Sequence, residues 1–360
     1  MTWTTPGFPL RQKDKNVQRE KFYNSTFSVA SQQAKVAQDR EAHLFPMATM
    51  QNDYHKPNST IPYHHDSYSY LSPSRYAGCL TNKIVLITGA GRGIGKATAL
   101  AFAAAGANVA CMARTKADID AVVKEIQEKG HPQAITVVGD VTDNYAPARV
   151  VQEIQEALGP IDVLINNAGI SRISDIEHET DISAAWKVVE VNMKGTLAFT
   201  HAVLPFMKAR KQGVIINVVS VLATISLPYF SAYSAAKAGI TRATEIMDIE
   251  FRPHGIYSYA LHPAMTKATN LGVGALNETA HGKVEGVRKF MDDFVLSMKD
   301  TVNLPADTMV ALVADPDAKY MSGRYIDGTQ DLGAVLLEAK KGAEGRIEKE
   351  GLYALKVDTL

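Results

Sequence analysis

The stretch KIVLITGAGRGIGKATALAFAAAG, residues 83–106, decides the fold of this chain. It begins as an apolar run of strand length, passes through a glycine-rich loop and continues as an apolar stretch of helix length. Gly89, Gly93 and Gly95 have the spacing G-x-x-x-G-x-G, which permits a tight turn and lets a pyrophosphate approach the amides at the positive end of the helix. A simple strand-to-helix turn is the alternative, but this order of elements favours a dinucleotide-binding unit.

Apolar runs and amphipathic stretches alternate along the rest of the chain. Such alternation predicts an α/β fold, a doubly wound (Rossmann) parallel sheet with helices on both faces. The apolar runs predict strands at 83–88, 108–113, 134–139, 161–166, 213–220 and 256–262, with a last candidate at 323–327. The amphipathic stretches predict helices at 93–105, 116–129, 144–158, 180–210 and 231–252.

The composition changes near residue 80. Residues 1–80 are polar and have no sustained period of 2 or 3.6, so we expect a largely unstructured N-terminal extension. No internal repeat or second change in composition divides residues 81–330, which are therefore expected to form a single domain. Residues 331–360 are expected to be a helical or irregular C-terminal tail.

Composition also excludes several classes of function. Lys plus Arg and Asp plus Glu both total 38, so no net charge favours nucleic acid or an anionic membrane as a partner. Cys79 and Cys111 cannot form a disulfide framework, and no Cys/His cluster has zinc spacing, so no metal is expected. The chain has no run of 18 apolar residues and no apolar signal stretch in its first 30, so we expect a cytoplasmic protein.

The end of the second predicted strand bears on cofactor choice. A carboxylate there would bind the ribose 2′-hydroxyl of NAD, whereas an arginine accommodates the 2′-phosphate of NADP. The strand ends at Arg114, with no acidic residue before Asp118, and Arg92 in the glycine loop adds a second cation. The sequence favours NADP over NAD; the alternative is that both arginines are solvated surface charges.

Tyr233 and Lys237 have the i, i+4 spacing that places two side chains on one face of a helix. Tyrosine has a pKa of about 10 and is a poor acid or base near neutrality. One cation at about 4 Å supplies the roughly 4 kcal/mol needed to lower that pKa by about three units at an effective dielectric near 20. A Tyr-x-x-x-Lys pair also arises by chance in a chain with 14 Tyr, so the pair alone does not identify a function.

Taken in order, the motifs resemble those of the short-chain dehydrogenase/reductase (SDR) family, over roughly residues 81–330. They are T-G-x-x-x-G-x-G at 88–95, Asp140 in GDVTD after the third strand, NNAG at 166–169, Asn192 in the following helix, and Ser220 with Tyr233 and Lys237. The stretches YHHDSYSYLSPSRY and KYMSGRYIDGTQDL near the ends of the chain look like a fungal branch found in secondary metabolism.

The resemblance implies a catalytic role for four residues. Tyr233 would be the general acid in carbonyl reduction and the base in alcohol oxidation. Lys237 would lower the pKa of Tyr233 and bind the nicotinamide ribose. Ser220 would hydrogen-bond the substrate oxygen, and Asn192 would anchor a water that links Lys237 to solvent.

The resemblance also implies cofactor contacts, some with structural alternatives. Asp140 would contact the adenine, or would only cap the next helix through a residue such as Thr142. Asn167 would lie in a turn that faces the cofactor, or would simply form the turn. Ile94 is expected to pack, with its backbone beside the phosphates.

One stretch departs from the family pattern. HPAMTKAT has Ala264 where the family has a glycine after proline. The family threonine that touches the carboxamide would fall on Ala268 without a gap, which leaves Thr266 and Thr269 as candidates. We assign Thr266 to the cofactor site.

Residues 266–303 should cover the substrate, as that region does in relatives. Ser171, Ile173, Leu222, Tyr229 and Phe230 are further candidates for the pocket lining, and they favour a hydrophobic ketone or alcohol such as a polyketide or terpenoid.

The helices that hold Asn192 and Tyr233 form the dimer interface in relatives, so we expect a homodimer or homotetramer. The sequence predicts an NADP-dependent oxidoreductase that interconverts a ketone and a secondary alcohol. A related lyase, epimerase or dehydratase, or a non-catalytic nucleotide-binding sensor, remains open as an alternative.

Overall fold

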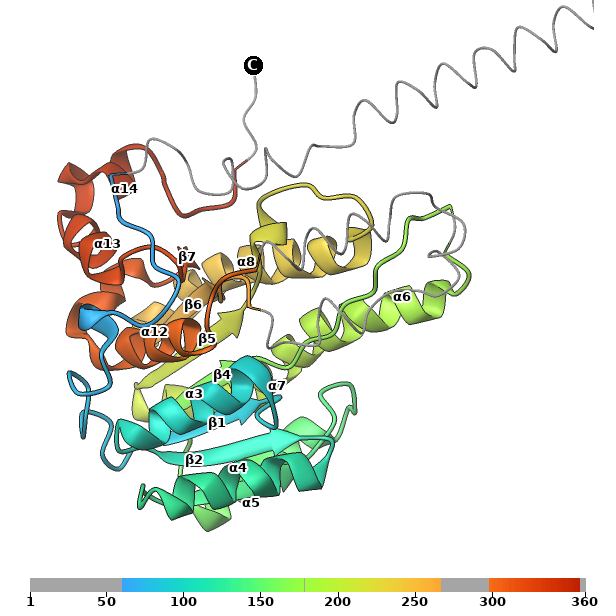
Figure 1. Cartoon of the computed structure of the whole chain (residues 1–360), viewed down its shortest axis with the longest axis vertical. Helices are drawn as coiled ribbons and strands as arrows, with labels where there is room; N and C mark the ends of the chain where they lie inside the picture. Colours follow the sequence, from blue (N-terminus) through green and yellow to red (C-terminus); the bar gives the residue numbers. More distant parts are fainter. Residues whose placement is uncertain (1–59, 178, 267–297, 357–360) are drawn as a thin grey trace, which may run out of the picture. The chain divides into compact units, whose positions relative to one another are not determined.

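The structure is a computed structural model that describes residues 60–177, 179–266 and 298–356 (Figure 1). Its centre is a sheet of seven parallel strands in the order β3-β2-β1-β4-β5-β6-β7. The strands are β1 (Ile84–Thr88), β2 (Asn108–Ala113), β3 (Ala134–Val138), β4 (Val163–Asn166), β5 (Gly213–Val218), β6 (Ile256–His262) and β7 (Tyr325–Asp327). The predicted doubly wound parallel sheet is confirmed. The strand order reverses between β1 and β4, where such sheets bind ligands beyond the carboxyl ends of the strands.

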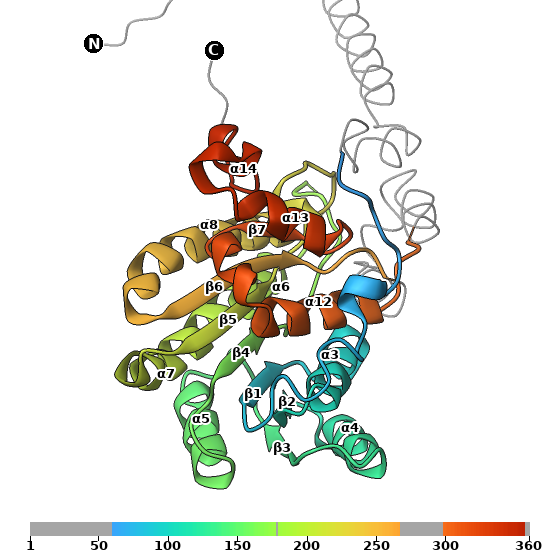
Figure 2. The same cartoon turned by 90° about the vertical axis from the view of Figure 1, so that its left-hand side faces the viewer.

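Helices cover both faces of the sheet (Figures 1 and 2). One face is covered by α3 (Gly93–Ala104), α4 (Lys116–Glu128), α12 (Asn303–Ala314) and α13 (Leu332–Ala339), followed by α14 (Arg346–Lys349). The other face is covered by α5 (Ala146–Ala157), α7 (Gly195–Arg210) and α8 (Ser231–Phe251). Strand β1 shows why both faces are apolar: Val85 and Ile87 pack on the first face, and Ile84 and Leu86 on the second.

The predicted helix at 180–210 is a run of three elements. Helix α6 (Ile182–Val189) leads into a π-helical turn at Glu190–Lys194, and α7 continues from it. Asp181 caps α6 by accepting from the N–H groups of Ser183 and Ala184. Single π-helical turns inside α-helices are frequent at functional sites, and Asn192 lies within this one.

Residues 60–82, called the arm below, differ from the sequence expectation. They were expected to belong to a largely unstructured extension, but Leu71, Tyr76 and Leu80 are buried in the core under α3 and α12. Backbone hydrogen bonds join Pro62 to Asp331 and Leu80 to Ala105. The arm therefore runs from α13 past α12 to α3, and the packed domain begins at least twenty residues before the predicted start. Its apolar residues are widely spaced and follow no period, so sequence periodicity gave no signal.

The described part of the expected C-terminal tail also packs into the domain, because Leu332, Val335, Leu336 and Ile347 are buried in the same cluster as α3 and α12. Within the described residues no helix is both long and apolar enough to cross a membrane.

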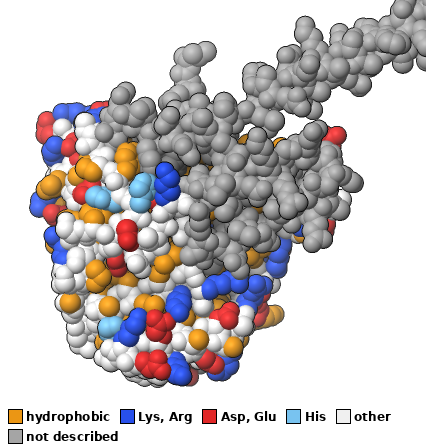
Figure 3. All heavy atoms as spheres, viewed as in Figure 1, with side chains coloured by type: hydrophobic (Ala, Val, Ile, Leu, Met, Phe, Trp, Pro, Cys, Tyr) orange, Lys and Arg blue, Asp and Glu red, His pale blue; other side chains and the backbone are white. Residues whose placement is uncertain are grey.

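On the face drawn in Figure 3, Lys and Arg side chains are interspersed with Asp and Glu side chains. Most of the predicted substrate cover, residues 267–297, lies outside the described residues.

Candidate active site

The glycine loop joins β1 to α3 through contacts that leave no room for a side chain. Gly89 has φ +69°, and a Cβ on Gly95 would lie 2.1 Å from the carbonyl oxygen of Gly89. Helix α3 begins at Gly93, and Arg92 at its N-cap makes no capping hydrogen bond with its side chain. The first amides of α3 are therefore not capped by the residue that usually caps them, and they suit an anionic group such as a pyrophosphate. This loop fits a dinucleotide.

Asn167 holds the glycine loop in place from the end of β4. Its side-chain amide donates to the carbonyl oxygens of Thr88, at 2.9 Å, and Gly89, at 3.1 Å. The backbone N–H groups of Asn167 and Ala168 both donate to the Thr88 hydroxyl. The two N–H donors of the Asn167 side chain are thus used within the turn, and a direct contact with a cofactor stays a prediction.

Asp140 and Arg114 lie at the ends of neighbouring strands. Asp140 Oδ1 accepts from both the N–H and the hydroxyl of Thr142, each at 2.8 Å. These bonds close a local turn and do not cap the next helix, because α5 begins at Ala146 with Tyr145 at its N-cap and no side-chain cap. The contact with adenine stays a prediction.

Asp140 Oδ2 lies 3.9 Å from Arg114, whose side chain is 70% exposed. Burial opposes ionisation of Asp140, but the Thr142 hydrogen bonds and the charges of Arg114 and Lys187 outweigh it and lower the pKa of the carboxyl. Arg92 is also exposed.

Ser220, Tyr233 and Lys237 come together beyond the carboxyl end of β5. Tyr233 and Lys237 lie one turn apart on α8, with Lys237 Nζ 5.6 Å from the centre of the Tyr233 ring. Ser220 lies close enough to the Tyr233 hydroxyl to lower the pKa of the phenol, and the Ser220 Oγ accepts from the N–H of Leu222 at 3.2 Å. Lys237 Nζ donates to the carbonyl oxygen of Val218 at 2.7 Å. The predicted constellation is therefore assembled in one place.

Burial governs the ionisation of this pair. Tyr233 is 6% exposed and Lys237 is 4% exposed. Burial raises the pKa of Tyr233 to about 12, against the opposing effect of Ser220, and it lowers the pKa of Lys237 to about 7. This differs from the expectation that Lys237 would lower the pKa of the phenol, because burial, which penalises the charged form of each group, is the largest cause of both shifts. The neutral phenol is thus the stable form of Tyr233.

Asn192 presents a buried acceptor to the same region. Its side-chain amide donates to the carbonyl oxygens of Ile170, at 2.7 Å, and Val188, at 2.8 Å. Its Oδ1 is buried and has no hydrogen-bond partner among the described residues. A Cβ on Gly169 would lie 2.8 Å from this oxygen and 3.8 Å from Lys237 Nζ. Because an unpaired buried acceptor costs about 1–3 kcal/mol, the gap suits a polar group such as the expected water.

His262 is a residue that the sequence analysis missed. It ends β6, is 2% exposed, and its Nδ1 accepts from the N–H of Val221 at 3.1 Å. Burial lowers its pKa, against the charges of Asp327 and Asp300, and so favours the neutral ring that can accept this bond. His262 therefore fixes the residue that follows Ser220. The signal in the sequence was a histidine at the carboxyl end of a largely apolar strand.

The backbone at Ala264 explains why the family has a glycine at this position. Ala264 has φ +70°, the left-handed region that favours glycine. Thr266 is 5% exposed and follows shortly after β6, whereas Thr269 lies outside the described residues.

Two loops approach each other beside Ser220. The N–H of Ser174, after β4, donates to the carbonyl oxygen of Tyr229, after β5, at 3.0 Å. The predicted lining residues lie on these loops: Ile173, Leu222 and Phe230 are buried, and the Ser171 hydroxyl is buried without a partner among the described residues. Their placement is compatible with a pocket wall.

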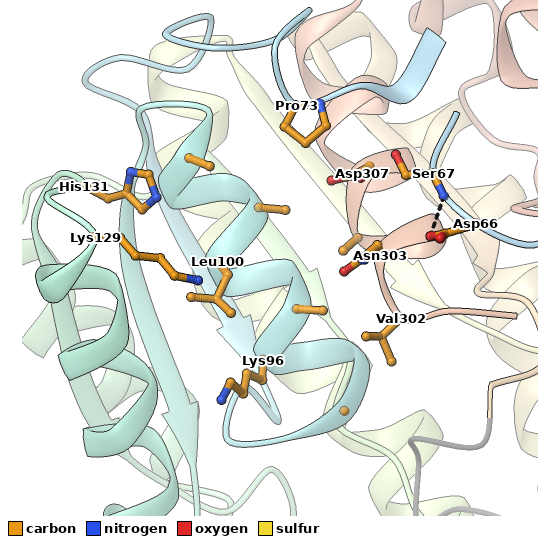
Figure 4. Close-up of a pocket in the computed structure, with 15 residues that line it drawn as sticks. Asp66, Ser67, Pro73, Lys96, Leu100, Lys129, His131, Val302, Asn303 and Asp307 are labelled. Atoms are coloured by element: carbon orange, nitrogen blue, oxygen red, sulfur yellow. Dashed lines mark hydrogen bonds between the residues drawn. The ribbon is translucent and has the colours of Figure 1, made fainter. Parts of the chain in front are cut away.

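A groove of about 670 Å³ lies elsewhere, between α3 and α12 (Figure 4). Lys96 and Lys129 stand on one side of it, and Asp66 and Asp307 on the other. None of the predicted catalytic side chains lines this groove. No cluster of His, Cys, Asp and Glu among the described residues could hold a metal ion.

Comparisons with known proteins agree with this fold. The short chain dehydrogenase family profile matches residues 83–279. A short chain dehydrogenase of Pseudocercospora fijiensis is 39% identical over 307 residues, which cover 84% of this chain and 98% of the relative. One of Monascus purpureus is 30% identical, over 78% of this chain and 92% of the relative. The crystal structure of a short chain dehydrogenase from Mycobacterium smegmatis has a TM-score of 0.58 at 27% identity, over 70% of this chain and 93% of that one. The chain belongs to the short chain dehydrogenase family.

Proposed function

We propose that this protein is an NADP-dependent oxidoreductase that interconverts a ketone and a secondary alcohol, with Tyr233 as the general acid and base. The observation that carries the proposal is the placement of Ser220 beside the hydroxyl of buried Tyr233, with buried Lys237 on the next turn of α8. A binding module has no need for such an arrangement of proton donors and acceptors, so it favours an enzyme over a sensor.

The chemistry divides between the cofactor and the chain. A nicotinamide dinucleotide, when bound, supplies or accepts the hydride. The Ser220 hydroxyl holds the substrate oxygen close to Tyr233. Tyr233, kept neutral by burial, gives its proton to that oxygen in reduction and takes it back in oxidation. Lys237 and Asn192 border the gap beside Gly169, and a water held there by Asn192 would link Lys237 to solvent.

Family membership implies NAD or NADP as the cofactor, and two features of the chain support NADP. Arg114 ends β2 and Arg92 precedes α3, and both side chains are exposed near the loop that fits a dinucleotide. Because Asp140 lies 3.9 Å from Arg114, part of that positive charge is offset, so the cofactor preference is best measured directly. Arg114→Ala should weaken binding of NADPH and leave binding of NADH nearly unchanged.

Apolar side chains support proposals for the class of substrate and for the oligomeric state. Ile173, Leu222 and Phe230 on the loops near Ser220 favour a hydrophobic ketone or alcohol. The fungal relatives support a role in making a secondary metabolite such as a polyketide or terpenoid. Exposed apolar side chains on α7 and α8, among them Phe206 and Ile249, support a homodimer or homotetramer, and we propose a cytoplasmic location.

The test is the Tyr233→Phe variant, assayed with NADPH and a panel of ketones at the NADPH absorbance band. Loss of a proton donor at this position should lower turnover by about 10²- to 10⁴-fold, while NADPH binding, measured by fluorescence, stays near the wild-type value. Wild-type turnover in Tyr233→Phe would overturn the mechanism. Substrate conversion without net change in NADPH would favour a lyase, epimerase or dehydratase instead.

A further inference from the structure

Two adjacent histidines of the arm each contact an aspartate. His65 Nδ1 lies 2.6 Å from Asp300 Oδ1, and His64 Nε2 lies 3.1 Å from Asp331 Oδ2. The two carboxylates serve different parts of the molecule. Asp331 caps α13 by accepting from the N–H of Ala334, whereas Asp300 reaches the segment that follows β6.

Asp300 holds Met265 through two hydrogen bonds. Its Oδ2 accepts from the N–H of Met265 at 2.6 Å, and its own N–H donates to the carbonyl oxygen of Met265 at 3.2 Å. Met265 lies between Ala264, in the left-handed region, and buried Thr266. A backbone that is strained at a non-glycine residue persists only where its surroundings fix it, and Asp300 provides such a fixture.

The arm in turn fixes Asp300. The side chain of Asp300 is only 6% exposed, while that of His65 is 55% exposed, so His65 supplies a partner to a nearly buried carboxylate. The next residue, Thr301, donates its N–H to the His65 carbonyl oxygen at 2.9 Å and its hydroxyl to Asp66 at 2.5 Å. Figure 4 shows Asp66 beside the first turn of α12.

We infer that His65 and Asp300 are positioning residues for the nicotinamide end of the cofactor site. His65 orients Asp300, and Asp300 holds the backbone on which Thr266 is presented. The inference rests on the proposed function, because Thr266 is the proposed cofactor contact. It gives the arm, which lies outside the region matched by the family profile, a part in the site.

The experiment compares His65→Ala with His64→Ala in the full chain, by fluorescence titration with NADPH and by hydrogen exchange at the Met265 amide. His64 is the matched control, because it sits in the same arm and contacts a carboxylate that caps α13. His65→Ala should weaken NADPH binding by about tenfold, the change expected for the loss of one charge-assisted hydrogen bond, and should speed exchange at Met265. His64→Ala should do neither. His65→Asn can keep a donor near the Nδ1 position. It should therefore retain most of the wild-type NADPH affinity and most of the wild-type protection from exchange at Met265.

Two results would overturn the inference. One is a His65→Ala variant with wild-type NADPH affinity and wild-type exchange at Met265. The other is equal effects from both alanine variants, which would mean that the arm only stabilises the fold. If His65→Ala does not fold, Asp300→Asn has the same size and should give the same two changes. Failure of the wild-type protein to bind any dinucleotide would instead contradict the proposed function, and the Met265 exchange rates would still test the His65–Asp300 contact.

Discussion

The two ends of the proposed site are built by opposite means. At the glycine loop, function depends on atoms that are absent, because a Cβ on Gly95 would lie 2.1 Å from a backbone oxygen. At the proton-transfer end it depends on side chains that are present and buried, Tyr233 and Lys237. Substitutions that add volume should therefore have the largest effect at the glycine loop. Substitutions that change charge, and changes of pH, should have the largest effect at Tyr233 and Lys237.

The largest effect is expected from Gly95→Ala. The new methyl group would meet the Gly89 carbonyl oxygen and, at 2.5 Å, the Asn167 amide nitrogen, neither of which can move without disturbing the turn. We expect a loss of about 3 kcal/mol or more in the free energy of unfolding, measured by urea denaturation. Gly130→Ala is the control for backbone strain alone, because its Cβ would meet nothing within 4 Å while its φ of +69° still disfavours alanine, by about 1–2 kcal/mol. A loss for Gly95→Ala no larger than the control's would show that the close approach is not what constrains the loop.

The same contrast explains what could be predicted from the sequence. Strands such as β2 and β6 were predicted to the residue, because a fully buried parallel strand is an apolar run with polar residues at its ends. Ser220, Tyr233 and Lys237 were found because their spacing is fixed by one strand end and one helix. The pKa of Tyr233 was predicted in the wrong direction, since burial depends on packing that spacing does not reveal. The arm and the His65–Asp300 contact were missed, because they join residues far apart in sequence with no period between them.

Lys237→Met should change stability and activity in opposite directions. The pKa of Lys237 is lowered from 10.5 to about 7 in the folded protein. Between those values the unfolded lysine binds a proton that the folded one lacks, so wild-type stability should rise with pH across this window. Lys237→Met has no such dependence and should be more stable than wild type at neutral pH and below, by roughly 2 kcal/mol or more, while losing activity.

The measurement is urea unfolding of both proteins from about pH 6.5 to about pH 9.5. The advantage of Lys237→Met should shrink by about 1.4 kcal/mol per pH unit above pH 7. The series stops there because the raised pKa of Tyr233 makes stability fall again above pH 10. Lys124→Met, at an exposed position of α4, is the matched control for the loss of a lysine. A constant difference between wild type and Lys237→Met would contradict the lowered pKa.

Gly169→Ala tests the gap between Asn192 and Lys237. Its methyl group would lie 2.8 Å from Asn192 Oδ1 and would fill the gap next to Lys237. We expect a loss of about 1–2 kcal/mol in the free energy of unfolding and reduced turnover. Asn192→Ala removes the clashing oxygen, so the double variant should be more stable than the sum of the single changes allows. Strict additivity in this double-mutant cycle would mean that the methyl group does not contact Asn192.

The smallest effect, with the opposite sign, is expected from Ala264→Gly. Here the backbone adopts φ +70° without a glycine, at a cost of about 1–2 kcal/mol. Glycine removes that strain but adds freedom to the unfolded chain, so the net gain should be roughly 0.5 kcal/mol in thermal or urea unfolding. Ala235→Gly, exposed in the second turn of α8, should instead lose about 1 kcal/mol. The same substitution would then stabilise one site and destabilise the other, because only Ala264 is held in a left-handed conformation by Met265 and its bonds to Asp300; equal losses at both positions would show that Ala264 carries no strain.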